Sequence, residues 1–210
     1  MLSTVEGRVL GCLLEKQRTV ADQYPLTLNG LVAACNQSTA REPVMHVVEH
    51  DVETAVASLK AEGLLRFVHP SHGRTVTRYR QVIDERLELD APGSALLALL
   101  LLRGPQTVAE LLNRSARLHE FTSATDVEVG LTALADGGIV ERLDRQAGQK
   151  ENRWKQLVAD EADVAPPQMT FTASAGALVA GDLAAGVLAD RVSELEERVS
   201  RLEAALADLL

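Results

Sequence analysis

One stretch of this sequence occurs twice, and the repeat limits the possible folds more than any other feature of the chain. Residues 51–65, DVETAVASLKAEGLL, return as residues 126–140, DVEVGLTALADGGIV. In both copies the apolar residues are spaced four and then three residues apart and a glycine follows, which is typical of one helix face and its C-terminal end. Segments 78–81 (RYRQ) and 153–156 (RWKQ) are related by the same offset of 75 residues. The pattern therefore predicts a helix and a following strand that repeat as one unit.

Capping and turn residues predict the elements around the first copy. Ser3 and Glu6 form a capping box, which predicts a helix from there to about Lys16. Thr27 is expected to cap a second helix, residues 36–48 are expected to be irregular, and the repeated helix comes third. Residues 64–68 and 75–82 are rich in β-branched and alternating residues and flank a turn at 71–73, so they predict a β-hairpin.

The second copy has the same order of elements in a shorter stretch. Residues 94–102 predict the opening helix, and the Gly-Pro pair at 104–105 ends it. Thr107 with Glu110, and Thr125 with Glu128, form two more capping boxes, which predict the starts of the second and third helices. Residues 139–143 and 152–158 predict the second hairpin.

Three helices followed by a hairpin, twice over, predict a mainly α protein with small β-hairpins. The arrangement that this order indicates is a pair of tandem winged helix-turn-helix domains. We expect domain 1 at residues 1–90, domain 2 at 91–160, a flexible linker rich in Ala, Pro, Gly and Thr at 161–184, and a C-terminal coiled-coil helix at 185–210. Both opening helices are strongly apolar, so we expect them to pack at the centre of each domain or between the two domains.

The C-terminal stretch has the spacing of a coiled-coil seam. Its apolar residues alternate four and three apart at Leu188, Val192, Leu195, Val199, Leu202, Leu206 and Leu209. Valine at a positions and leucine at d positions favour a parallel dimer, in which Arg191 at g would face Glu196 at e of a second chain. The sequence therefore predicts a homodimer through this helix. The alternative is one amphipathic helix that folds back on its own domain.

Several short motifs resemble the YceH-like family of bacterial proteins of unknown function. They include RVLG at 8–11, YPL at 24–26, CNQ at 35–37, REP at 41–43 and RGPQT at 103–107, and the resemblance covers residues 2–158. It implies tandem winged-helix domains, often followed by a coiled-coil tail, and it implies no reaction. The chain departs from the family at Ser38, where a lysine is usual, and at Leu112, where an arginine is usual. Both changes remove positive charge and weigh against phosphate contacts by those two loops.

The distribution of charge bears on the DNA-binding function that winged helices often have. The net charge is −9, and residues 161–210 carry −6 of it. Both third helices are acidic, which opposes the counterion release that drives DNA binding, whereas both hairpins are basic. We therefore expect any contact with double-stranded DNA to be made by the hairpins, through Arg66, Arg74, Arg78, Arg80, Arg145, Lys150 and Arg153. The alternative is that these are solvated hairpin residues, while Tyr79 and Trp154 are expected to anchor each hairpin in the core.

A second polar cluster lies in the irregular segment between the second and third helices. Asn36, Gln37 and Arg41 either line a recognition surface or hold the turns of this loop together through their own hydrogen bonds, and the second role is favoured. His46 and His50 are four residues apart, but the carboxylate or third histidine that a metal site needs is not evident. Cys12 and Cys35 lack CxxC spacing and are expected to be free buried thiols.

No enzyme motif is present, so we expect neither catalysis nor a cofactor. The sequence has no phosphate-binding glycine loop, no GxSxG and no HExxH. The longest apolar run, at 95–102, is too short to cross a bilayer, so a cytoplasmic location is expected. Two functional hypotheses follow. One is a dimeric DNA-binding or transcription-associated protein that uses the basic hairpins, and the other is a non-enzymatic scaffold that binds other proteins through its helices and tail.

Overall fold

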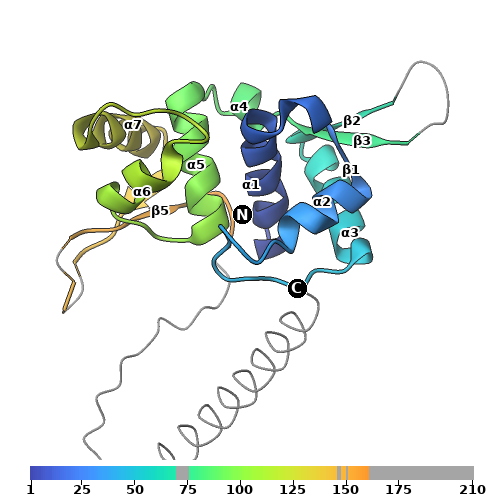
Figure 1. Cartoon of the computed structure of the whole chain (residues 1–210), viewed down its shortest axis with the longest axis horizontal. Helices are drawn as coiled ribbons and strands as arrows, with labels where there is room; N and C mark the ends of the chain where they lie inside the picture. Colours follow the sequence, from blue (N-terminus) through green and yellow to red (C-terminus); the bar gives the residue numbers. More distant parts are fainter. Residues whose placement is uncertain (70–75, 146–147, 150, 161–210) are drawn as a thin grey trace, which may run out of the picture. The chain divides into compact units, whose positions relative to one another are not determined.

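The computed structural model describes residues 1–69, 76–145, 148–149 and 151–160. These residues belong to one compact unit, Met1–Val164. They are mainly helical with small antiparallel sheets (Figure 1), which confirms the predicted mainly α class with small β elements. The predicted linker (161–184) and coiled-coil helix (185–210) lie outside the described residues, and the domain boundary near residue 90 stays a prediction.

The first copy of the repeat has the predicted order of helices and strands. Its elements are α1 (Thr4–Thr19), the 3-10 turn η1 (Ala21–Gln23), β1 (Leu26–Thr27), α2 (Leu28–Cys35), α3 (Glu49–Ala61), β2 (Leu65–Val68), β3 (Arg78–Gln81) and α4 (Ile83–Arg86). The capping box of Ser3 and Glu6 opens α1, and the Thr27 hydroxyl accepts from the Gly30 amide at the start of α2. Both predicted helix starts are thus confirmed, and residues 36–48 are irregular, as expected.

The second copy follows with α5 (Ala91–Arg103), α6 (Val108–Ser115), α7 (Ala124–Asp136), β4 (Val140–Arg142) and β5 (Trp154–Gln156). The capping box of Thr107 and Glu110 opens α6, as predicted. The predicted box of Thr125 and Glu128 is wrong, because the Ser123 hydroxyl accepts from the Asp126 amide and Thr125 lies inside α7. Helix α5 also begins earlier than predicted, because Asp90 caps it ahead of a proline in its first turn.

The first hairpin belongs to a three-stranded sheet in the described part of the chain, with strand order β1-β3-β2. Register pairs Phe67 with Tyr79, and the two rings meet edge to face with centroids 5.1 Å apart. Tyr79 is buried, which confirms it as an anchor of this hairpin. Trp154 is half-buried against the core, and it forms an antiparallel bridge with Gln106. The short strand β1 was not predicted, because two residues carry no recognisable period.

The core is built around direct packing of α1 on α5. Figure 1 shows the two helices side by side, with α2 and α3 next to α1 and with α6 and α7 next to α5. This is one of the two placements expected for the apolar opening helices. Gly11 allows the close approach of α1 to α5, since a β-carbon there would lie 3.0 Å from Leu101 and Leu102. A β-carbon at Gly7 would lie 2.6 Å from that of Ala159, which follows β5.

The two ends of the described chain are tied together. The Leu2 amide donates to the Val158 carbonyl at 3.0 Å, and the Asp160 amide donates to the Leu2 carbonyl at 2.7 Å. The side chains of Leu2 and Ala159 are both buried in the core. The start of the first repeat therefore helps to hold the end of the second.

Candidate functional site

The exposed faces of the third helices, α3 and α7, carry matching acidic groups. Glu53 of α3 and Glu128 of α7 occupy equivalent positions of the repeat, and both are exposed. Asp51 and Asp126, also exposed, each stabilise a helix start: Asp51 accepts from the Val48 amide at 3.4 Å, and Asp126 accepts from the Thr122 amide at 3.2 Å. The remaining acidic residues of the two helices, Glu49 and Asp136, are exposed as well.

Positive charge on these two helices is small. The basic residue in the range of α3 is Lys60, and the range of α7 contains no lysine or arginine. The Lys60 ammonium group lies 4.2 Å from the centre of the Phe67 ring, in a cation–π contact with the first hairpin. The exposed faces of α3 and α7 are therefore electronegative.

The arginines of the first hairpin contact partners within the chain. Arg66 and Arg80 are directly opposite on β2 and β3, and both pair with the carboxylate of Glu85, Arg66 at 3.6 Å. Arg78 is exposed and donates to the main-chain carbonyls of Pro25 at 2.8 Å and Gln23 at 3.4 Å. Arg74, another of the residues predicted to contact DNA, lies outside the described residues. Glu85 of α4 thus offsets some of the positive charge expected for the described part of this hairpin.

The second hairpin is similar. Arg153 donates to the Pro105 carbonyl at 2.7 Å and lies 3.3 Å from the Glu110 carboxylate, while Lys155 pairs with Glu141 at 2.6 Å. Arg145 is exposed, and Lys150 lies outside the described residues. The structure therefore brings Arg66 and Arg80 together, and it connects Arg78 and Arg153 to the turns before the second helices.

The polar loop between α2 and α3 is held by its own side chains. The Asn36 side chain makes two hydrogen bonds with the main chain of Val47, donating to its carbonyl and accepting from its amide, both at 2.8 Å. Arg41 is buried, so it does not belong to an open polar surface. Its guanidinium donates to the carbonyls of Ala34 at 3.0 Å and Ala40 at 2.8 Å and to the Gln37 amide oxygen at 2.7 Å. These contacts agree with the structural role of the cluster.

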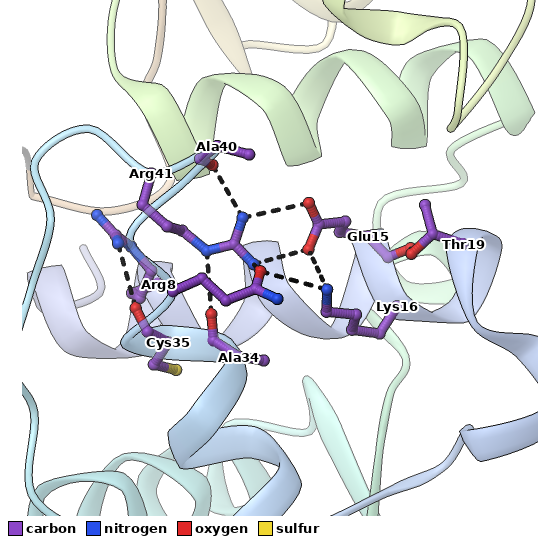
Figure 2. A network of polar contacts seen from close by, with 9 residues as sticks. Arg8, Glu15, Lys16, Thr19, Ala34, Cys35, Ala40 and Arg41 are labelled. Carbon is purple, nitrogen blue, oxygen red and sulfur yellow. Dashed lines mark hydrogen bonds and ion pairs between the residues drawn. The ribbon is translucent and has the colours of Figure 1, made fainter. Parts of the chain in front are cut away.

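Arg41 also makes a buried ion pair with α1. Figure 2 shows its guanidinium facing the carboxylate of Glu15, with N···O distances of 2.7 and 3.2 Å, while Lys16 lies 3.1 Å from the same carboxylate. Burial alone would raise the pKa of Glu15, but the hydrogen bond and charge of Arg41 together with Lys16 outweigh it and lower the pKa. Glu15 is therefore ionised near neutral pH, and the pair fixes the loop on α1.

Sequence reasoning missed the partners of these basic residues. Glu15 is far along the sequence from Arg41, and Glu85 lies on a different element from Arg80. No local sequence pattern therefore indicates either contact. Glu110 was identified as a capping residue, but its second role as the partner of Arg153 arises from a contact between residues 43 apart in the sequence. Arg8 is charged but buried, and it donates to the Pro43 carbonyl at 2.7 Å.

Other candidate sites gain no support from the described residues. No group of His, Cys, Asp and Glu in that part of the chain could hold a metal ion, and His46 and His50 are exposed. In the same residues, no helix is long and apolar enough to cross a membrane. Cys12 and Cys35 are free and buried, as predicted. The seven predicted dimerisation residues, from Leu188 to Leu209, lie outside the described residues.

Comparison with known proteins places this mainly helical repeat protein in a family. Residues 2–149 match the model described as "Protein of unknown function, DUF480". A "UPF0502 protein" of Pseudomonas fluorescens (strain SBW25) is 42% identical over 208 residues, covering 99% of this chain and 93% of the relative. A UPF0502 protein of Stenotrophomonas maltophilia (strain K279a) is 41% identical over 209 residues, covering 100% of this chain and 94% of the relative. The chain belongs to the DUF480 family, which confirms the resemblance to uncharacterised YceH-like proteins.

Proposed function

We propose that this chain is a non-enzymatic protein-binding scaffold made of two winged helix-turn-helix units. Each unit has three helices followed by a hairpin, and in each the third helix presents an acidic exposed face. The equivalent carboxylates Glu53 and Glu128 carry the proposal, since they place negative charge at the same point of both units. The partner that suits these faces is a protein with a basic surface.

Electrostatics favour such a partner over duplex DNA. A carboxylate held about 4 Å from a phosphate is repelled by about 1 kcal/mol in bulk-water dielectric, and by more where the interface excludes water. Insertion of α3 or α7 into the major groove would bring several such groups near the backbone phosphates. The same groups attract lysine and arginine side chains, so one feature disfavours DNA and favours a basic protein.

DNA binding through the hairpins is the second candidate. It is favoured by the exposure of the Arg66 side chain, which is 66% accessible despite its contact with Glu85, and by the exposure of Arg145 on the equivalent hairpin. In this mode the third helices would face away from the duplex and the hairpins would contact phosphates. Binding would then be weak, independent of sequence and strongly dependent on salt.

One pair of matched variants distinguishes the two candidates. Glu53→Gln/Glu128→Gln removes one exposed carboxylate from each unit, and Arg66→Gln/Arg145→Gln removes one exposed guanidinium from each. The full chain and both variants would be used to capture proteins from nuclease-treated extract of the source cells, and any captured protein would be purified and titrated. The proposal predicts at least tenfold weaker binding by the glutamate variant and unchanged binding by the arginine variant.

The opposite pattern would contradict the proposal. If the arginine variant loses the partner while the glutamate variant keeps it, the hairpins are the interaction surface. If no protein is retained above an acidic control protein of similar net charge, the third helices are not a docking surface. Circular dichroism of both variants would show that the fold is intact, which is expected because all four side chains are exposed.

We also propose that the chain is a cytoplasmic homodimer held by residues 185–210. The support is the heptad spacing from Leu188 to Leu209, with valine at a and leucine at d positions. Sedimentation equilibrium of the full chain should give a dimer mass, and removal of residues 185–210 should give a monomer. A monomeric full chain would favour the fold-back alternative, and cell fractionation tests the location.

A further inference from the structure

Two arginines share one carboxylate beside the turn that joins α5 to α6. Arg114 and Glu110 are one turn apart on α6, with 3.8 Å between the guanidinium and the carboxylate. Arg153, just before β5, lies 3.3 Å from the same carboxylate. Figure 1 shows α6 and β5 on the same side of α5, and both contact it. Glu110 also accepts from the Thr107 amide in the capping box of α6, so one carboxylate interacts with three donors.

A third arginine ends α5 and adds positive charge next to this pair. The buried Gln106 side chain donates to the carbonyls of Leu99 and Gly104, at 2.9 and 3.3 Å. Its amide oxygen accepts from Arg114 at 2.7 Å, which holds the Arg114 guanidinium at the C-terminal end of α5. Arg103 is the last residue of α5 and is half-buried. Within the described residues, its side chain makes no hydrogen bond or ion pair.

The positive charges at the end of α5 repel each other. Burial lowers the pKa of Arg103 and the charge of Arg114 lowers it further, while the carboxylates of Glu42 and Glu15 act in the opposite direction. Both guanidinium groups remain ionised, because the pKa of arginine lies far above neutral pH. Three guanidinium groups thus lie around this turn, beside one carboxylate that two of them share.

This excess of charge is specific to the second copy of the repeat. Arg78 has the position of Arg153 in the first copy, and it donates to the Pro25 carbonyl as Arg153 donates to that of Pro105. The bond of Arg153 to the turn is therefore a structural contact that both copies share. Helix α2 contains no charged residue, so the first copy has no counterpart of Arg114.

We propose that Arg103, Arg114 and Arg153 form an arginine site that binds one phosphate group of a small molecule, either inorganic phosphate or a phosphate monoester. Arginine suits this ligand because its guanidinium donates two parallel hydrogen bonds to phosphate oxygens. Arg103 and Arg114 would contact the phosphate, while Arg153 holds the turn. The phosphate would supply the negative charge that the shared carboxylate provides only in part.

The surroundings of the arginine site suit a single phosphate rather than the backbone of a duplex. The Glu42 amide donates to the Leu102 carbonyl at 2.9 Å, which places an exposed acidic residue beside Arg103. Glu42 and Glu110 would repel further phosphates, and duplex binding draws on several phosphate contacts. The site does not depend on an arginine at position 112, because Leu112 is half-buried against the core.

The test is an NMR titration of the isotope-labelled full chain with sodium phosphate, compared with sodium chloride at equal ionic strength. Phosphate should shift the signals of residues 103–114 in a saturable way, with a Kd of roughly 1 mM or tighter, and chloride should not. Adenosine monophosphate is the second probe. Tighter binding of this probe than of phosphate would support a phosphate monoester as the ligand, and equal or weaker binding would support inorganic phosphate.

Four variants locate the site. Arg103→Gln removes no hydrogen bond or ion pair within the described residues, so it should keep the fold and weaken phosphate binding about tenfold. Arg114→Gln should weaken binding to a similar extent. Arg86→Gln, at an exposed position of α4, is the matched control and should bind as wild type does. Glu110→Gln keeps a residue type that suits the capping box but removes the competing charge, so it should bind phosphate several-fold more tightly.

Three results would overturn the proposal. Shifts no larger with phosphate than with chloride would show that the three arginines bind no phosphate. Equal affinity of wild type, Arg103→Gln and Arg114→Gln would place the phosphate elsewhere on the chain. Unchanged affinity of Glu110→Gln would show that its carboxylate does not compete with the ligand. The wild-type and Arg103→Gln titrations decide the first two results even if Arg114→Gln fails to fold.

Discussion

Replacement of Arg41 tests how the loop between α2 and α3 is held. Arg41→Met keeps much of the side-chain volume and removes the charge. The guanidinium is fully inaccessible, and the Glu15 carboxylate that it contacts at 2.7 Å is 14% accessible. The substitution also removes the donors to the carbonyls of Ala34 and Ala40 and to Gln37. The loop would lose the contacts that fix its first half to α1 and α2.

The expected cost follows from what is left behind. Removal of one partner of a buried ion pair costs about 3–5 kcal/mol, because the other charge stays uncompensated. Glu15 keeps Lys16 at 3.1 Å and part of its hydration, which places the expected loss at the lower end, about 3 kcal/mol. Glu141→Gln provides the matched control, since it breaks a pair with Lys155 whose side chains are 45% and 31% accessible. That pair should contribute about 0–1 kcal/mol.

Equilibrium urea unfolding of the full chain, followed by circular dichroism, measures both values. Equal m-values among the variants would show that the free energies are comparable. A double-mutant cycle with Glu15→Gln should give a coupling energy of about 1–3 kcal/mol between Arg41 and Glu15. If Arg41→Met costs no more than Glu141→Gln, the buried network does not stabilise the fold and the reasoning is wrong.

Three further predictions concern packing, pH and the loop. Gly7→Ala should lower the free energy of unfolding by about 1–3 kcal/mol, because its β-carbon would lie 2.6 Å from that of Ala159. Gly137→Ala, whose nearest atoms lie at 3.5 Å, should not destabilise the chain in the same urea unfolding experiment. Because the pKa of Glu15 is lowered below its ordinary 4.5, its stabilisation is fully present above about pH 4.5 and is lost as pH falls through the folded-state pKa. Acid unfolding of Glu15→Gln should therefore show a shallower pH dependence than wild type, and an identical curve would contradict this. Asn36→Ala should accelerate hydrogen exchange of the Val47 amide, because this amide donates to the Asn36 side-chain oxygen at 2.8 Å. Unchanged exchange in α7 is the internal control, and equal protection of Val47 in both proteins would refute the prediction.

The order of elements was predictable because it depends on local signals. Side-chain caps at Ser3, Thr27 and Thr107 mark helix starts through hydrogen bonds that span three residues, and such bonds are visible in the sequence. The error at Thr125 has the same local origin. Ser123 and Thr125 both fit a cap, and the structure uses Ser123, whose hydroxyl accepts from the Asp126 amide.

The candidate site was predictable only in its composition. Charge along the sequence predicted acidic third helices and basic hairpins, and the exposed positions of Glu53 and Arg66 agree with that. The compensation of Arg80 by Glu85 and the burial of Arg41 against Glu15 arise from contacts between separate elements. No periodic or capping pattern encodes such contacts, so they required the structure.

Fluorescence anisotropy of a labelled random-sequence duplex, titrated with the full chain at low salt, most directly tests whether the acidic third helices exclude DNA. Non-specific DNA binding has a Kd of about 1–100 µM at physiological salt and is tighter at low salt. The proposed scaffold predicts no saturable binding up to about 100 µM protein at low salt. Saturable binding with a Kd of about 10 µM or tighter, lost steeply as salt is raised and weakened by Arg66→Gln/Arg145→Gln, would contradict the scaffold and establish the hairpins as a DNA-binding surface.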